Sequence, residues 1–246
     1  DPKRASFRYS NILHKTSYMT YCGLTAITTT DKCTKMQKKS PPPEKFLCQT
    51  APSALRNASS ILRVLKDILP EKCSVLEIGS GTGQHSVIFS EGINCLKWIP
   101  TDVDASNFES ITGWAQTATN NIPSSPRLID ASQPDWCLTA NDNIDVIVSI
   151  NVIHISPWSV TKGIVKGAQK FLPKDGFLYF YGPFIQNNVS TAAGNIAFDK
   201  NLRERNEDWG LRNINEVEKL ANKHALKLDR IVKMPSNNLS VVFTKT

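Results

Sequence analysis

A glycine-rich turn is the segment of the chain best suited to chemistry. Residues 75–85 read VLEIGSGTGQH and place Gly79, Ser80, Gly81 and Gly83 between an apolar run and a helical pattern. Glycine has no β-carbon, so the backbone of such a turn can approach a bound ligand closely. We therefore predict a cofactor-binding loop at these residues. A turn that only joins a strand to a helix is the alternative.

The spacing of the glycines separates two classes of cofactor. The dinucleotide pattern G-x-G-x-x-G, counted from Gly79, requires a third glycine where the chain has Gln84. The chain has G-x-G-x-G instead, and Glu77 stands two positions before the first glycine. This pattern resembles motif I of the class I S-adenosylmethionine-dependent methyltransferases. S-adenosylmethionine is therefore the predicted cofactor, and Glu77 is one of its predicted contacts.

Acidic residues follow the next two apolar runs. Asp102 comes nineteen residues after Gly83, at the distance where an adenosine-binding sheet places a carboxylate that accepts the ribose hydroxyls. Asp104 is either a second ligand or a cap for the following helix, and we favour the cap. Asp130 and Ala131 end a third run, and in the methyltransferase pattern they would lie at the edge of the adenine.

The segment SINVIHISPW, residues 149–158, follows a fourth apolar run. Ligands in open α/β sheets bind where the strands end, so Asn151 is predicted to contact the cofactor and His154 to face the methyl acceptor. An imidazole titrates near neutral pH, which makes His154 a candidate base or acceptor-orienting group. A hydrogen-bonded structural histidine is the alternative. The segment lacks the Asn/Asp-Pro-Pro-aromatic loop of many amino-group methyltransferases.

Alternating patterns of strand and helix position these residues. Buried strands are predicted at 74–79, 97–102, 127–130, 145–151 and 177–183. Helices are predicted at 53–69 (with Ser53 as N-cap), 83–92, 106–121, 159–172 and 213–224. Two final strands, 226–235 and 239–245, are joined by three residues and must form an antiparallel hairpin. We predict an α/β, Rossmann-like fold: a doubly wound, mostly parallel seven-stranded sheet with an antiparallel C-terminal hairpin.

The positive charge of the chain is concentrated in its first fifty residues. The net charge is +7, and residues 1–50 contain nine Lys or Arg against three Asp or Glu. We predict that residues 1–50 are a disordered basic extension, since their composition cannot bury enough apolar surface to fold, and that residues 51–246 are the methyltransferase-like domain. A mitochondrial targeting role for the extension is less favoured than a native start at Met36. The near-neutral remainder disfavours nucleic acid as a partner.

Cysteine and histidine residues are scattered. Six cysteines and four histidines form no CxxC pair and no ligand cluster, so we predict no metal site and no disulfide framework. Reduced thiols fit a cytoplasmic or nuclear protein. No apolar run approaches the roughly 20 residues that cross a bilayer, so no membrane partner is predicted. The sequence does not predict the oligomeric state.

A closer resemblance covers residues 51–246. The chain is similar to the methyltransferase-like protein 26 family in several segments: RN at 56–57, LEIGSGTGQH at 76–85, PTDVD at 100–104, INVIHISPW at 150–158, YGPF at 181–184, FDKNLRERNEDWGLRN at 198–213 and MPSNNLSVVF at 234–243. It departs from the family at Leu55, where glutamate is common, and at Gly79, where alanine is common. The resemblance implies the class I fold, S-adenosylmethionine, and cofactor contacts from Arg56 and Asn57. It names no substrate.

Three functions fit these observations. A methyltransferase acting on a small molecule is favoured, because the folded part is nearly neutral and the glycine loop is intact. A methyltransferase of a protein or RNA, and a non-catalytic cofactor-binding interaction protein, are the alternatives. The segment 184–212 is too polar for a core and is expected either to form a lid or binding loop, or an amphipathic helix that packs through Leu202.

The predicted extension leads to a simple test. Deleting residues 1–35 should leave the melting temperature and the affinity for S-adenosylmethionine unchanged, because these residues are predicted to be disordered and their positive charge is not shared by the domain. Differential scanning calorimetry and isothermal titration of the full and shortened chains make the measurement. A large fall in melting temperature would show that the extension packs on the domain.

Overall fold

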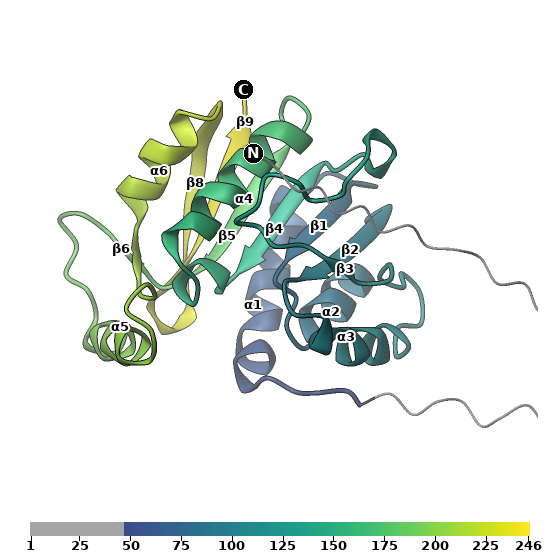
Figure 1. The fold of residues 1–246 in the computed structure, drawn as a ribbon, viewed down its shortest axis with the longest axis horizontal. Coiled ribbons are helices and arrows are strands. Elements are labelled where there is room, and N and C mark those ends of the chain that lie inside the picture. Colours follow the sequence, from purple (N-terminus) through teal and green to yellow (C-terminus); the bar gives the residue numbers. More distant parts are fainter. Residues whose placement is uncertain (1–46) are drawn as a thin grey trace, which may run out of the picture. The chain divides into compact units, whose positions relative to one another are not determined.

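The computed structural model describes residues 47–246 as a seven-stranded sheet with helices on both faces (Figure 1). The predictions made for residues 1–46 lie outside this range. The helices are α1 (Pro52–Ile68), α2 (Gln84–Gly92), α3 (Phe108–Ala115), α4 (Trp158–Phe171), α5 (Ala193–Arg205) and α6 (Ile214–Asn222). The strands are β1 (Ser74–Ile78), β2 (Lys97–Asp102), β3 (Arg127–Leu128), β4 (Val146–Ile150), β5 (Phe177–Gly182), β6 (Phe184–Ile185), β7 (Arg212–Asn213), β8 (Leu226–Met234) and β9 (Asn238–Lys245).

The strand order confirms the predicted fold. It is β3-β2-β1-β4-β5-β9-β8, with β1 to β5 parallel and β9 antiparallel to both of its neighbours. The short strands β6 and β7 pair separately. The order of the strands reverses at β1, which lies between β2 and β4. Ligands of doubly wound sheets bind at such a switch point, outside the carboxyl ends of the strands.

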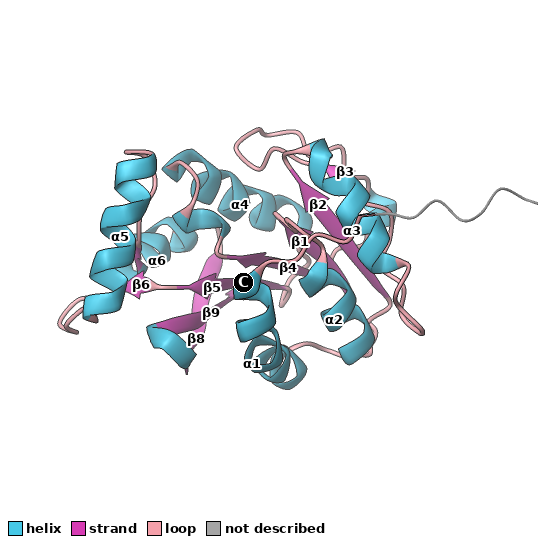
Figure 2. Cartoon of the chain, turned by 90° about the horizontal axis from the view of Figure 1, so that it is seen from below, coloured by secondary structure: helices cyan, strands magenta, loops and turns pink. Residues whose placement is uncertain are grey.

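The two faces of the sheet bury different sets of side chains. Because successive side chains of a strand point to opposite faces, Leu76 and Leu178 join a core with α4 and α6. Val75 and Tyr179, their direct neighbours in sequence, join a core with α1 and α2. Figure 2 shows α1 and α2 on one side of the sheet and α4 and α6 on the other. All five residues of β1 and of β4 are buried, which explains their mainly apolar sequences, interrupted only by Ser74, Glu77 and Ser149.

Three predicted elements differ from the structure at their ends. Helix α1 begins after Ala51, whose amide donates to Gln84 Oε1, so Ser53 is not the N-cap. Helix α3 ends at Ala115, six residues before the predicted end, because residues 117–121 are rich in Thr and Asn, which favour turns. Strand β3 contains only two of its four predicted residues.

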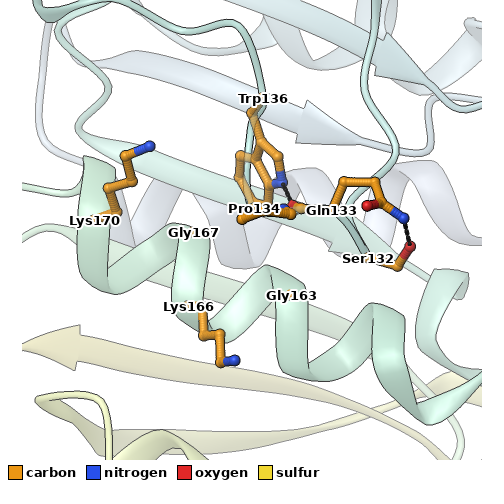
Figure 3. Close-up of a pocket in the computed structure, with 8 residues that line it drawn as sticks. All are labelled: Ser132, Gln133, Pro134, Trp136, Gly163, Lys166, Gly167 and Lys170. Atoms are coloured by element: carbon orange, nitrogen blue, oxygen red, sulfur yellow. Dashed lines mark hydrogen bonds between the residues drawn. The ribbon is translucent and has the colours of Figure 1, made fainter. Parts of the chain in front are cut away.

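Helix α4 packs unusually close to the segment that follows β3. A β-carbon at Gly163 would overlap the carbonyl oxygen of Ala131, and one at Gly167 would overlap the indole of Trp136. Figure 3 shows Trp136 facing the helix beside these two glycines, in a cavity that also contains Lys166. The helix therefore needs glycine at both positions in order to bring the end of β3 into the core.

The described part of the chain offers neither a membrane span nor a metal cluster. None of its helices has the length and apolar character needed to cross a bilayer. No group of three or more His, Cys, Asp and Glu side chains within residues 47–246 is arranged to hold a metal ion.

The close packing of α4 predicts the effect of one added methyl group. Gly167→Ala should lower the free energy of unfolding by about 1–3 kcal/mol, the usual cost of overpacking a core, because the new β-carbon collides with Trp136. Urea unfolding followed by circular dichroism measures the change. Gly194→Ala is the matched control, since a β-carbon at this position in α5 meets nothing within 4 Å. Equal free energies of unfolding for the two variants would contradict the close packing of Trp136 against Gly167.

Candidate active site

The glycine loop leaves β1 in a left-handed conformation. The φ angles of Gly79, Gly81 and Gly83 are +71°, +56° and +87°, a region that side chains disfavour. A β-carbon at Gly79 would lie 2.5 Å from Val152 Cγ2, and one at Gly83 would lie 2.6 Å from Ile111 Cα. A β-carbon at Gly81 would meet nothing within 4 Å. Two of the glycines therefore permit packing inside the protein, and only Gly81 faces open space.

Hydrogen bonds fasten the loop to the end of β2. The amide of Gly81 donates to Asp102 Oδ2 at 2.8 Å, and the amide of Ser80 donates to the Thr101 carbonyl at 2.8 Å. Ser80 Oγ accepts from the amide of Thr101 at 3.1 Å. The amide of Asp104 donates to Asp102 Oδ1 at 3.0 Å. A carboxylate accepts about four hydrogen bonds, so Asp102 retains acceptor capacity on both oxygens.

Asp104 is a helix cap. Its carboxylate accepts from the amide of Ser106 at 2.9 Å, at the start of the short 3₁₀ turn Ala105–Asn107 that precedes α3. The backbone amide of Ser106 lowers the pKa of Asp104. The structure thus favours the capping interpretation of this residue over the ligand interpretation.

Glu77 lies beneath the loop and within the sheet. Its Oε2 accepts from Ser86 Oγ at 2.5 Å and from Trp98 Nε1 at 2.8 Å. Burial raises the pKa of Glu77, while these hydrogen bonds oppose the shift. The carboxyl group therefore joins β1, β2 and α2 below the turn. Its contact with a cofactor remains a prediction.

The end of β3 reaches the same edge of the sheet. The amide of Ile129 donates to the Asp102 carbonyl at 3.0 Å, which places Asp130 and Ala131 beside the end of β2. Asp130 Oδ1 accepts from the amide and the hydroxyl of Ser132 at 2.9 and 2.7 Å. The Ser132 hydroxyl lowers the pKa of Asp130. The structure therefore brings the predicted adenine edge next to Asp102.

His154 does not reach the acceptor side, which corrects the prediction of an accessible imidazole. The residue is 0% exposed, and neither ring nitrogen has a hydrogen-bond partner among the described residues. The ring lies edge-on to Phe184, and its Nε2 occupies the space where a β-carbon of Gly182 would be. Burial, followed by the positive charge of Arg212, lowers the pKa of His154 to about 3. The imidazole is neutral and enclosed.

The backbone at Asn151 explains why His154 turns inward. Asn151 has φ +62° and ψ −6°, and the chain then forms the 3₁₀ turn Val152–His154. Arg212 holds this turn from outside, because its guanidinium donates to the carbonyls of Ile153 and Ser156 at 2.8 and 2.5 Å. The amide of Asn151 donates to the Tyr181 carbonyl at 2.8 Å. Asn151 itself therefore stays at the strand ends, as predicted.

A polar network that the sequence did not reveal crosses the carboxyl ends of the strands. His85 Nε2 and Asn57 Oδ1 lie 2.8 Å apart, and Asn238 Nδ2 donates to Tyr181 Oη at 3.0 Å. Burial lowers the pKa of His85 to about 4, so its imidazole is neutral. The YGPF and MPSNN segments contain two of these residues, but only the fold shows that they meet.

Arg56 and Asn57 lie on α1 across a cavity from the strand ends. The cavity has a volume of about 430 Å³ and also contains Asn151 and Tyr181 among its lining residues. The predicted cofactor residues thus divide into two neighbouring sets. One surrounds the glycine loop and the ends of β2 and β3, and the other surrounds this cavity.

Comparisons with known proteins agree with the fold. The sequence model of a family described as "Protein of unknown function (DUF938)" matches residues 48–245. The fold is similar to that of the pyocyanin biosynthetic protein PhzM, with a TM-score of 0.62 and 14% identity over 78% of this chain and 56% of that chain. It is also similar to human N-acetylserotonin methyltransferase in complex with SAM, with a TM-score of 0.60 and 13% identity over 78% and 52%.

A third structure matches over nearly its full length. This is a TehB-like SAM-dependent methyltransferase from Corynebacterium glutamicum, with a TM-score of 0.53 and 17% identity over 79% of this chain and 95% of that chain. The chain spans about half the length of the first two proteins. At these identities the likeness establishes the fold.

The enclosed imidazole predicts a specific pH dependence of stability. The folded pKa of His154, about 3, lies below the ordinary value near 6.5, so between these values the unfolded chain binds a proton that the native state excludes. As pH falls below about 6.5, the native state should therefore lose about 1.4 kcal/mol per pH unit through this group. His154→Leu should remove this contribution.

Urea unfolding at several pH values between about 6 and 4.5 measures the effect. His85 contributes in the same direction in both proteins, so only the difference between wild type and variant reports on His154. Parallel stability curves for the two proteins would show that the imidazole titrates in the native state.

Proposed function

The chain belongs to the family described as "Protein of unknown function (DUF938)", and within it we propose that this protein is an S-adenosylmethionine-dependent methyltransferase acting on a small molecule. The observation that carries the proposal is the loop at the switch point of the sheet. Its Gly81 faces open space, and its amides are fixed beside the carboxylate of Asp102. The C-terminal antiparallel strands and the similarity to methyltransferase structures support the same function.

The residues present suit the proposed cofactor. The open space at Gly81 admits a ligand against the backbone, and Asp102 keeps acceptor capacity for ribose hydroxyls. The residues that would hold the cofactor are Arg56, Asn57, Gly79, Ser80, Gly81, Gly83, Asp102, Asp130, Ala131 and Asn151. Glu77 is assigned a supporting role beneath the loop. Bound S-adenosylmethionine would supply an electrophilic methyl group with a neutral thioether as its leaving group.

The protein therefore has to position the acceptor and exclude water more than to generate a leaving group. The cavity at the ends of β4 and β5 is of a size that fits a small molecule. A protein or RNA acceptor, or cofactor binding without turnover, remains the alternative. We also retain membership in the methyltransferase-like protein 26 family, and a cytoplasmic or nuclear location, as proposals from the sequence.

The loop gives a direct test of cofactor binding. Gly81→Val should abolish binding of S-adenosylmethionine, because the new side chain fills the only open position of the loop. Isothermal titration calorimetry measures the affinity. The variant should remain folded, since its β-carbon meets no other atom within 4 Å.

Lys72→Val is the matched control. Lys72 has φ +58°, close to the +56° of Gly81, and is exposed in the turn before β1, at the opposite end of that strand. Both variants place a β-branched residue in a left-handed conformation, but Lys72 already has a β-carbon there, so Lys72→Val should lose less stability than Gly81→Val. Only Gly81→Val should lose the cofactor. Unchanged affinity in Gly81→Val would place the cofactor elsewhere.

A further inference from the structure

The cavity beside the glycine loop has a distinctive lining. We call it the acceptor cavity. Its walls come from α1, the ends of β4 and β5, α5 and the turn between β8 and β9. It is lined by Ser53, Arg56, Asn57, Ser60, Asn151, Ile155, Tyr181, Pro183, Asn195, Phe198, Pro235, Ser236 and Asn238. Asn195 Nδ2 donates to the Asn237 carbonyl at 3.1 Å, which fixes α5 to the turn. The cavity is therefore formed by elements that are far apart in the sequence.

The described lining residues contain one charge and no proton acceptor suited to neutral pH. The charge is that of Arg56, and the set includes no Asp, Glu, His, Lys or Cys side chain. The nearby imidazole of His154 is enclosed behind Gly182. Burial raises the pKa of Tyr181, so its hydroxyl stays protonated. A ligand in this cavity meets hydrogen-bonding Ser, Asn and Tyr side chains and the positive charge of Arg56, which is also a proposed cofactor contact.

Tyr181 is oriented to donate into the cavity. Asn238 Nδ2 donates to its oxygen at 3.0 Å. A phenolic hydroxyl also has one proton to donate. No described residue accepts that proton, so it is left for a ligand.

These observations limit the form in which an acceptor can react. An aliphatic alcohol, an ammonium group or a thiol must lose a proton before or during methyl transfer, and a base usually accepts it. A carboxylic acid has a pKa near 4 and is ionised at neutral pH without help. A carboxylate accepts hydrogen bonds only, and Arg56, Tyr181 and the Ser and Asn side chains of the lining can donate them.

We propose that the acceptor cavity binds a small carboxylic acid as its carboxylate, with Tyr181 as a hydrogen-bond donor to it, and that the product is a methyl ester. The proposal rests on the methyltransferase function proposed above. Ile155 and Phe198 remain 45% and 42% exposed at the cavity. They give the uncharged body of the acid an apolar surface to contact.

The proposed step balances without a proton transfer. A carboxylate oxygen forms a bond to the methyl carbon as the bond from that carbon to sulfur breaks, and the electron pair leaves on sulfur. An anion and a sulfonium cation become a neutral ester and a neutral thioether. Because this step transfers no proton, it needs no base, and the cavity lining contains none.

Chemical stability of the product gives the first test. The full chain is incubated with methyl-labelled S-adenosylmethionine and the fraction of a cell extract below about 1 kDa, a size that the cavity admits. Methyl esters release labelled methanol in mild base, whereas ethers, methylamines and thioethers do not. Label recovered mainly as volatile methanol supports the proposal, and label retained in base-stable products overturns it. Cofactor binding without any transfer would overturn the methyltransferase function itself.

The pH profile gives a second test in the same assay. Transfer to a carboxylate should proceed at a nearly constant rate between about pH 6 and pH 9, because its pKa lies below this range. An acceptor that must be deprotonated would react faster as pH rises. A rate that increases tenfold per pH unit would overturn the assignment of a carboxylate.

A pair of tyrosine variants tests the role of Tyr181. Tyr181→Phe should lower base-labile transfer by about tenfold, the effect of losing one hydrogen bond to a charged group, and should leave the affinity for S-adenosylmethionine within about twofold. Tyr179→Phe is the matched control, since Tyr179 lies on the same face of β5 and bonds to Ser240 Oγ at 2.7 Å outside the cavity. Equal loss of transfer in both variants, at equal melting temperatures, would remove Tyr181 from the site.

Discussion

The site depends on one constraint on the backbone: the chain must turn sharply at the carboxyl end of β1, between that strand and helix α2. The three glycines with positive φ make this turn possible. Gly79 allows Val152 to approach from the end of β4, and Gly83 allows α2 to pack on Ile111 of α3. The loop is thus held by packing on two sides and by Asp102 on a third. Among these three glycines, only Gly81 leaves a space for a side chain that no other protein atom fills.

Helix α1 links the stability of the domain to the shape of the acceptor cavity. Ala58, Ile61 and Leu65 of this helix are buried in the core against the sheet. The first turns of the same helix carry Arg56 and Asn57 to the cavity. Because one rigid element fills both roles, the polar side chains at the cavity are positioned by apolar contacts further along the helix. The sequence upstream of β1 therefore belongs to the site as well as to the fold.

The sequence predicted the fold well, because the fully buried strands β1 and β4 read as apolar runs and the glycine turn follows the first of them. It predicted β3 poorly, since that strand has only two residues and Leu128 is 60% exposed. The structure disfavours His154 as a base and favours the structural alternative, because the direction of its side chain depends on the left-handed conformation of Asn151, which the residue types do not specify. The hydrogen bonds between Tyr181 and Asn238 and between Asn57 and His85 join distant parts of the chain and were beyond any argument from local spacing.

His154 shapes the site through its volume, although its proton is unavailable. Its Nε2 occupies the position of a β-carbon at residue 182, so β5 must end in glycine there. Gly182 has φ +156° and stands directly after Tyr181, so the packing of His154 fixes the exit of the strand next to the hydroxyl that faces the cavity. An unpaired imidazole costs stability when buried, and here it lies edge-on to Phe184. His154 therefore has a packing role next to the cavity and does not act as a base within it.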